Sequence, residues 1–206
     1  MSERDHRLAR AAYWAMCDLV DDQVGRLLEK LEETGQAENT MVIFTSDHGE
    51  MLGDHGIYWK GPYFYEPAVR VPLSVRWPGV IPAGRRSGSL IELSDLAPTI
   101  LEAAGAERPV GMQARSFWRL LTGESELHEH REDLYSEYYN AMPWHREPTA
   151  QVTMVRTRRH KIVAAHGTGT GELYDLEDDP NETRNLWNDP ESIDLKLAMY
   201  ARLADR

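Results

Sequence analysis

The stretch that decides the fold is Thr40-Met41-Val42-Ile43-Phe44-Thr45-Ser46-Asp47-His48-Gly49-Glu50. Its first six residues form a short, continuous apolar run that lacks strict alternation. Such a run is typical of a strand that is buried on both faces, as in a parallel sheet. In open α/β sheets, ligands gather at the carboxyl ends of the strands, so the residues that follow this strand are candidates for a functional site.

The residues directly after the strand carry groups that could bind a cation. Asp47 offers a hard carboxylate oxygen and His48 offers an imidazole nitrogen. Gly49 allows the backbone to bend tightly behind them. Turns use the same residue types, so this short motif by itself leaves open a metal site and an ordinary turn.

The segments around this strand are predicted to alternate between helix and strand, as in an α/β fold. Residues 6–33 carry apolar side chains at steps of three and four, which predicts an amphipathic helix that Gly35 ends. Residues 71–77 are typical of another strand, and a helix is expected to begin at Ser94-Asp95 and to close at Gly105. Helix, strand, loop, strand and helix in this order indicate an α/β sheet.

After about residue 107 the predicted elements change to short strands without intervening helices. This suggests a first part over 1–107 and a second part over 108–206. Because no helix separates its strand candidates, the second part is expected to contain a small antiparallel sheet. An amphipathic helix over 190–204 should end the chain. The strand candidates are 134–139, 151–157, 161–165 and 172–176.

The composition of the chain limits which partners and which covalent cross-links it can have. The net charge of −11 over 206 residues disfavours nucleic-acid binding, which depends on neutralising phosphates. The chain has neither an apolar run long enough to span a membrane nor an N-terminal secretory signal, so we expect no membrane association, and cytoplasm and periplasm both stay open. Cys17 is the single cysteine, which excludes an internal disulfide. Its place in the amphipathic helix predicts a buried structural thiol.

A longer stretch carries a family resemblance. It reads Ser46-Asp47-His48-Gly49-Glu50-Met51-Leu52-Gly53-Asp54-His55-Gly56-Ile57-Tyr58-Trp59-Lys60-Gly61-Pro62, and Glu66-x-x-x-Arg70-Val71-Pro72-Leu73 follows. This resembles the Asp-His variant of the sulfatase family in the alkaline-phosphatase-like superfamily, a variant that also occurs in phosphonate monoester hydrolases and related phosphodiesterases. Residues 93–101, 154–162 and 172–186 resemble later blocks of the same family. The resemblance implies part of an α/β/α sandwich, followed by a four-stranded antiparallel sheet with a terminal helix.

The resemblance also assigns roles. Asp47 and His48 would bind a divalent metal (Ca²⁺, or Mg²⁺ or Mn²⁺), and Lys60, thirteen residues after Asp47, would contact the sulfate. His55 would serve as a substrate contact or as a scaffold of the loop. Aromatic side chains of the same region would wall a pocket or pack in the core, and a later loop would select the substrate. The aromatic residues are Trp59, Tyr63, Phe64 and Tyr65, and the later loop contains Trp144-His145-Arg146.

The family's nucleophile is missing from the sequence. Sulfatases convert a Cys or Ser in the pattern Cys/Ser-x-Pro/Ala-x-Arg to formylglycine, and neither Cys17 nor any serine begins that pattern here. The sequence therefore resembles the C-terminal portion of a sulfatase, inactive by itself and expected to self-associate through exposed strand edges. Three functions stay open: a hydrolase of a small anionic sulfate ester, a phosphonate monoester or phosphodiester hydrolase, and a catalytically dead binding module.

Overall fold

The computed structural model describes residues 2–126, 130–140 and 150–206. These residues divide into two compact units: residues 1–60 with 67–85, and residues 61–66 with 86–206. The division at residue 107 suggested by the sequence stays a prediction. No helix among the described residues has both the length and the apolar character needed to cross a membrane.

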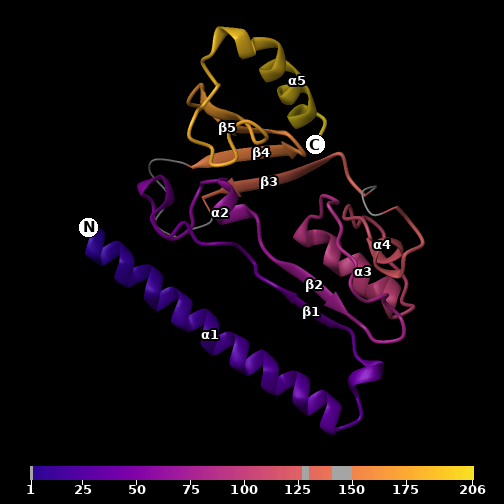
Figure 1. The fold of residues 1–206 in the computed structure, drawn as a ribbon. Helices are drawn as coiled ribbons and strands as arrows, with labels where there is room; N and C mark the ends of the chain where they lie inside the picture. The colour runs from indigo at the N-terminus through magenta and orange to yellow at the C-terminus, as the bar shows by residue number, and fades with distance from the viewer. Residues whose placement is uncertain (1, 127–129, 141–149) are drawn as a thin grey trace. The chain divides into compact units, whose positions relative to one another are not determined.

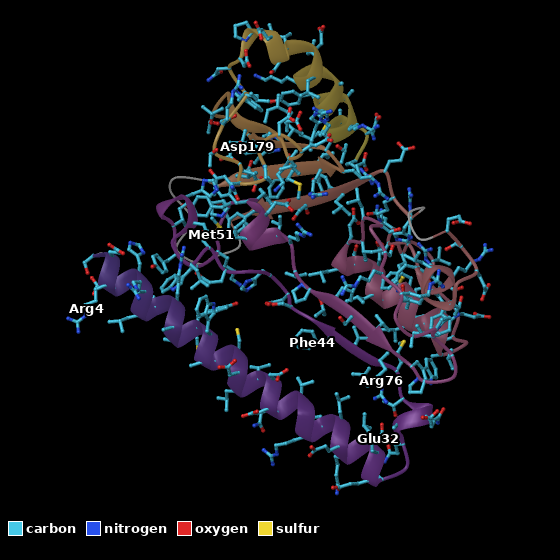
Figure 2. All side chains as sticks on the ribbon, viewed as in Figure 1. Arg4, Glu32, Phe44, Met51, Arg76 and Asp179 are labelled. Carbon is cyan, nitrogen blue, oxygen red and sulfur yellow. The ribbon has the colours of Figure 1, made fainter. Side chains whose placement is uncertain are left out.

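The first unit opens with α1 (Glu3–Glu33), the predicted amphipathic helix (Figure 1). Its N-terminus has a capping box in which Ser2 and Asp5 satisfy each other's backbone N–H groups. Near its other end, Glu32 pairs with Arg76 at 3.0 Å (Figure 2). No described residue of α1 is buried, and its large apolar side chains include Trp14, which is 66% exposed.

Two expectations for the first unit are wrong. Cys17 is exposed, because the apolar stripe of α1 has little packed against it within the described residues. β1 (Val42–Thr45) pairs with β2 (Leu73–Arg76) in an antiparallel ladder, from Val42 opposite Arg76 to Thr45 opposite Leu73. β1 is not buried on both faces either, since Phe44 is 44% exposed (Figure 2). Self-association through such open edges stays a prediction.

The second unit contains the predicted four-stranded antiparallel sheet. Its strands follow in chain order, each paired with the next: β3 (Asp133–Tyr139), β4 (Gln151–Thr157), β5 (His160–Ala165) and β6 (Thr170–Asp175). The terminal helix α5 (Ile193–Ala204) packs against β4 and β5 (Figure 1). The core between sheet and helix consists of Val155, Ile162, Ala164, Leu173, Trp187 and Met199.

Shorter helices complete the unit. α3 (Leu96–Ala103) begins directly after a turn that contains Asp95, as the sequence predicts, and α4 (Trp118–Thr122) follows it. Asp95 is fully buried and forms hydrogen bonds with Arg131, His130 and the backbone N–H of Arg115. Burial raises the pKa of this carboxyl, but the hydrogen bonds from His130 and Arg131 outweigh burial and hold the pKa well below its ordinary value.

Candidate active site

The loop after β1 is held against the backbone that precedes β2. The Gly49 N–H donates to the Ala68 carbonyl at 2.8 Å. A Cβ at Gly49 would lie 1.9 Å from the Pro67 carbonyl oxygen, so only glycine permits this approach. The glycine of the Asp-His-Gly motif therefore sets the path of the chain immediately after the two candidate metal ligands.

Glu50 closes the rest of the loop. Its Oε1 accepts the backbone N–H of Leu52 at 3.1 Å and that of Trp59 at 2.6 Å. The Met51 N–H donates to the Trp59 carbonyl at 3.2 Å, and the Met51 side chain is fully buried (Figure 2). These contacts fix the two ends of segment 51–59 together, although the segment contains several left-handed residues.

The N-terminal part of α1 supports the same loop from outside. His6 Nδ1 lies 2.5 Å from the Tyr58 hydroxyl, and the two rings stack. Arg10 donates to the Leu52 carbonyl at 3.1 Å and pairs with Asp54 at 3.0 Å. Asp54 thus links the loop to α1 through this half-exposed ion pair.

Asp47 and His48 lie side by side at the start of the loop. His48 Nε2 is 3.4 Å from Asp47 Oδ2, and the Asp47 side chain is 82% exposed. His48 Nδ1 is 2.8 Å from the Gly49 carbonyl oxygen, which can only accept, so this hydrogen bond requires a proton on Nδ1; in the neutral tautomer that has this proton, the lone pair is on Nε2. Asp47 Oδ1 accepts the His48 N–H at 3.0 Å, which leaves Oδ2 to face Nε2.

The geometry of this pair fits a shared cation. Metal–oxygen and metal–nitrogen bonds of about 2.0–2.4 Å place neighbouring ligands roughly 3 Å apart, close to the observed separation of Oδ2 and Nε2. No group of three or more His, Cys, Asp or Glu side chains forms a metal site in the described part of the chain. Asp47 and His48 can thus supply two ligands, and the others would have to come from elsewhere.

Lys60 and His55 lie on the same loop and are both exposed. His55 adopts a left-handed backbone conformation with φ of 54° between Asp54 and Gly56. Within the described residues, no ion pair or hydrogen bond engages the Lys60 ammonium. The structure brings Asp47 and His48 into contact and leaves the assignments of Lys60 and His55 as predictions.

The aromatic residues of this region have different environments. Phe64 is buried, as core packing would require, whereas Trp59 is 74% and Tyr63 is 40% exposed. The loop that contains Trp144-His145-Arg146 falls outside the described residues, so its predicted role in substrate selection stays a prediction.

The second unit contains a cluster of buried charged side chains that the sequence analysis did not predict. The fully buried Lys161 Nζ is 2.8 Å from Glu66 Oε1, 2.7 Å from Glu182 Oε1 and 2.8 Å from the Phe64 carbonyl oxygen. Glu66 also binds Arg156 at 2.9 Å, and its own N–H donates to Glu182 at 2.6 Å. Burial raises the pKa of Glu66, but the charge of Lys161 and the hydrogen bond from Arg156 hold it below the ordinary value.

This cluster fixes residues 64–66, shortly after Lys60 in the chain, to the antiparallel sheet. Glu66, Lys161 and Glu182 all lie in segments that resemble the sulfatase family. They are far apart in the sequence, so no local pattern predicts that they pair. Glu182 has a positive φ of 55°, which places its carboxylate in the cluster from a turn. Lys161 is a charged residue near the start of the largely apolar strand β5, and this was the signal that could have pointed to a buried partner.

Comparison with known proteins agrees with this fold. Residues 53–206 match the model of the family described as N-sulphoglucosamine sulphohydrolase, C-terminal. An N-acetylglucosamine-6-O-sulfatase of Bacteroides thetaiotaomicron is 34% identical over 181 residues, which is 87% of this chain and 32% of that protein. The chain thus spans about a third of the length of that relative.

Solved structures of sulfatases and of related hydrolases share the fold of this chain. A phosphonate monoester hydrolase of Agrobacterium radiobacter is 30% identical with a TM-score of 0.86, over 95% of this chain and 40% of that one. A 2-O GAG sulfatase is 28% identical with a TM-score of 0.86, over 99% of this chain and 44% of that one. Because the family model covers residues 53–206, which include the whole antiparallel sheet, this chain belongs to the sulfatase family whose C-terminal portion that model describes.

Proposed function

We propose that this chain is the C-terminal portion of a sulfuric ester hydrolase, which cleaves a small sulfate monoester to an alcohol and sulfate. The observation that carries the proposal is the loop after β1. It presents Asp47 and His48 as a ready pair of ligands and ends in an exposed lysine, in a chain that belongs to the sulfatase family.

Asp47 Oδ2 and His48 Nε2 would hold a divalent cation, for which calcium is the first candidate and magnesium or manganese the alternatives. When bound, such a cation neutralises negative charge on an ester's oxygens. Asp47 contributes the anionic charge that a hard cation prefers. The hydrogen bond to the Gly49 carbonyl favours the tautomer with the proton on Nδ1, in which Nε2 could act as a ligand.

Lys60 would place its ammonium on the sulfate oxygens, because a compact positive charge stabilises the charge that accumulates there during cleavage. His55, which precedes Gly56 on the same loop, would also contact the bound ester. The nucleophile and the remaining metal ligands would come from residues outside this sequence, so we expect the chain alone to bind metal weakly and to show no turnover.

Mutation of Lys60 tests the proposal in a catalytically complete protein that contains this chain. Lys60→Ala should reduce turnover of an activated aryl sulfate by about 10²–10³-fold, as loss of one preorganised donor does. The melting temperature should stay nearly unchanged, because the side chain is exposed and has no ionic partner within the described residues. Lys60→Arg should restore only part of the rate.

Lys30→Ala is the matched control, since it removes another exposed lysine, one that pairs with Glu33 on α1 rather than with the loop. It should leave the rate close to that of the parent protein. Parent-like turnover in Lys60→Ala would remove this lysine from the site and leave only Asp47 and His48.

A second activity of the same superfamily has specific support. The phosphonate monoester hydrolase of Agrobacterium radiobacter shares the fold of this chain over 95% of its length. A phosphonate monoester is also a compact anion that a metal and a lysine can hold. Comparison of an aryl sulfate with an aryl phosphonate monoester as substrates would distinguish the two activities.

A further inference from the structure

Lys161 is a fully buried cation in β5, directly before the apolar residues 162–165. Removing an ion pair from water costs free energy, and well-packed apolar side chains of similar volume often stabilise a protein as well or better. Stability alone therefore does not account for a charge at this position. What an ammonium offers beyond an apolar side chain is the direction of its hydrogen bonds.

The Lys161 ammonium makes three polar contacts, one for each of its protons. They are with the Phe64 carbonyl oxygen at 2.8 Å, Glu66 Oε1 at 2.8 Å and Glu182 Oε1 at 2.7 Å. Glu182 also accepts the Glu66 N–H at 2.6 Å. Lys161 and Glu182 together therefore hold segment 64–66 by the carbonyl of its first residue and by the backbone and side chain of its last.

The chain between this segment and Lys60 is short and stiff. Segment 61–66 belongs to the second unit, and Lys60 is the residue directly before it. Pro62 has a fixed φ, and the Tyr63 ring lies so close to Gly61 that a Cβ there would come within 3.0 Å of it. A segment with so little freedom can pass a displacement of Phe64 on to Lys60.

We propose that Lys161 is a positioning residue, which anchors the segment that follows Lys60 and so sets where the Lys60 ammonium meets the sulfate. The residue before Lys60 is held separately, because Glu50 accepts the N–H of Trp59 at 2.6 Å. A charged group that is fixed in advance needs no reorganisation during the reaction. The inference rests on the proposed function, since that function places the sulfate at Lys60.

Electron paramagnetic resonance of a nitroxide label at position 60 measures the anchoring without any ligand. The 206-residue chain with Cys17→Ser and Lys60→Cys carries the label on a single cysteine. Lys161→Met should make the label more mobile, which narrows its spectral lines. Arg131→Met is the matched control and should leave the spectrum unchanged, because it removes a buried cation of the same unit that pairs with Asp95 instead.

A second variant keeps the test valid if Lys161→Met alone fails to fold. Lys161→Met combined with Glu182→Gln removes one buried charge of each sign, and the amide oxygen of glutamine can still accept the Glu66 N–H. The Phe64 carbonyl nevertheless loses its donor. This double variant should therefore show the same gain in label mobility.

Kinetics of a catalytically complete protein that contains this chain test the link to Lys60. Lys161→Met should lower kcat/KM for an activated aryl sulfate by about 10–10²-fold, as a small displacement of a reacting group does. In a Lys60→Ala background the same substitution should have no further effect, since residues that act through one group are not additive. A merely structural role would lower the rate equally in both backgrounds.

The possible failures point to different errors. If the label is no more mobile in the Lys161 variants than in the parent or in Arg131→Met, or if Lys161→Met lowers the rate equally with and without Lys60, the inference is wrong and the proposed function stands. If Lys60→Ala turns over as fast as the parent protein, the role of Lys60 in the proposed function is wrong and the inference falls with it.

Discussion

Removal of the Glu182 carboxylate should destabilise the second unit more than any surface substitution. Glu182 is 2% exposed, and its two oxygens bind the Lys161 ammonium at 2.7 Å and the Glu66 N–H at 2.6 Å. In Glu182→Ala the fully buried ammonium keeps only Glu66 and one carbonyl as partners. The Glu66 N–H also loses its acceptor.

The magnitude follows from these two contacts. Each charge-assisted hydrogen bond contributes about 1.5–3 kcal/mol, and loss of one partner from a buried ion pair costs about 3–5 kcal/mol. We therefore expect Glu182→Ala to lower the free energy of unfolding by about 3–5 kcal/mol. Glu182→Gln should lose less, because its amide oxygen can still accept one of the two donors.

Urea unfolding followed by circular dichroism measures this difference. The matched control is Glu177→Ala, which removes a 69% exposed carboxylate paired with Arg159 and should change the free energy by at most about 0.5 kcal/mol. If Glu182→Ala lost less than about 1 kcal/mol with an unchanged slope against urea, the account of a tightly coupled buried cluster would be refuted.

Two further predictions concern the loop and the pH dependence of stability. Gly49→Ala should destabilise the first unit, because its Cβ would meet the Pro67 carbonyl, whereas Gly25→Ala in the open interior of α1 should stabilise it by up to about 1 kcal/mol; thermal melting compares them, and equal effects would contradict the close approach. The hydrogen bond from Arg159 lowers the pKa of Asp175 to about 2, so its stabilisation should be complete above about pH 4 and be lost as pH falls toward 2. Arg159→Met should flatten this part of a stability–pH curve, and an unchanged curve would show that the pair contributes nothing.

Local sequence patterns were sufficient for most of the elements. The apolar period over residues 6–33 predicts α1, and four short runs without intervening helices predict the antiparallel sheet β3–β6. These predictions succeed because helix and strand periodicities are properties of neighbouring residues. The Asp-His-Gly motif also located the candidate ligands, since glycine and the two polar residues serve the same short turn.

Other features depend on residues that are distant in sequence. The environment of Cys17 and the direction of the partner of β1 depend on what packs beside them, which an apolar pattern does not specify. Lys161 meets Phe64, 97 residues earlier, and Glu182, 21 residues later, only because the sheet and its turns bring them together. The period of a strand states which side chains share a face but not which distant charge they meet there.

The sequence by itself therefore determined the class of the fold, the order of its elements and the loop that carries Asp47, His48 and Lys60. Tertiary structure alone decided that Glu50 closes this loop and that Trp59 is held exposed in a left-handed conformation. The physical reason is that backbone strain and buried charge are stabilised by contacts across the fold, whereas helix and strand formation begins with neighbouring residues.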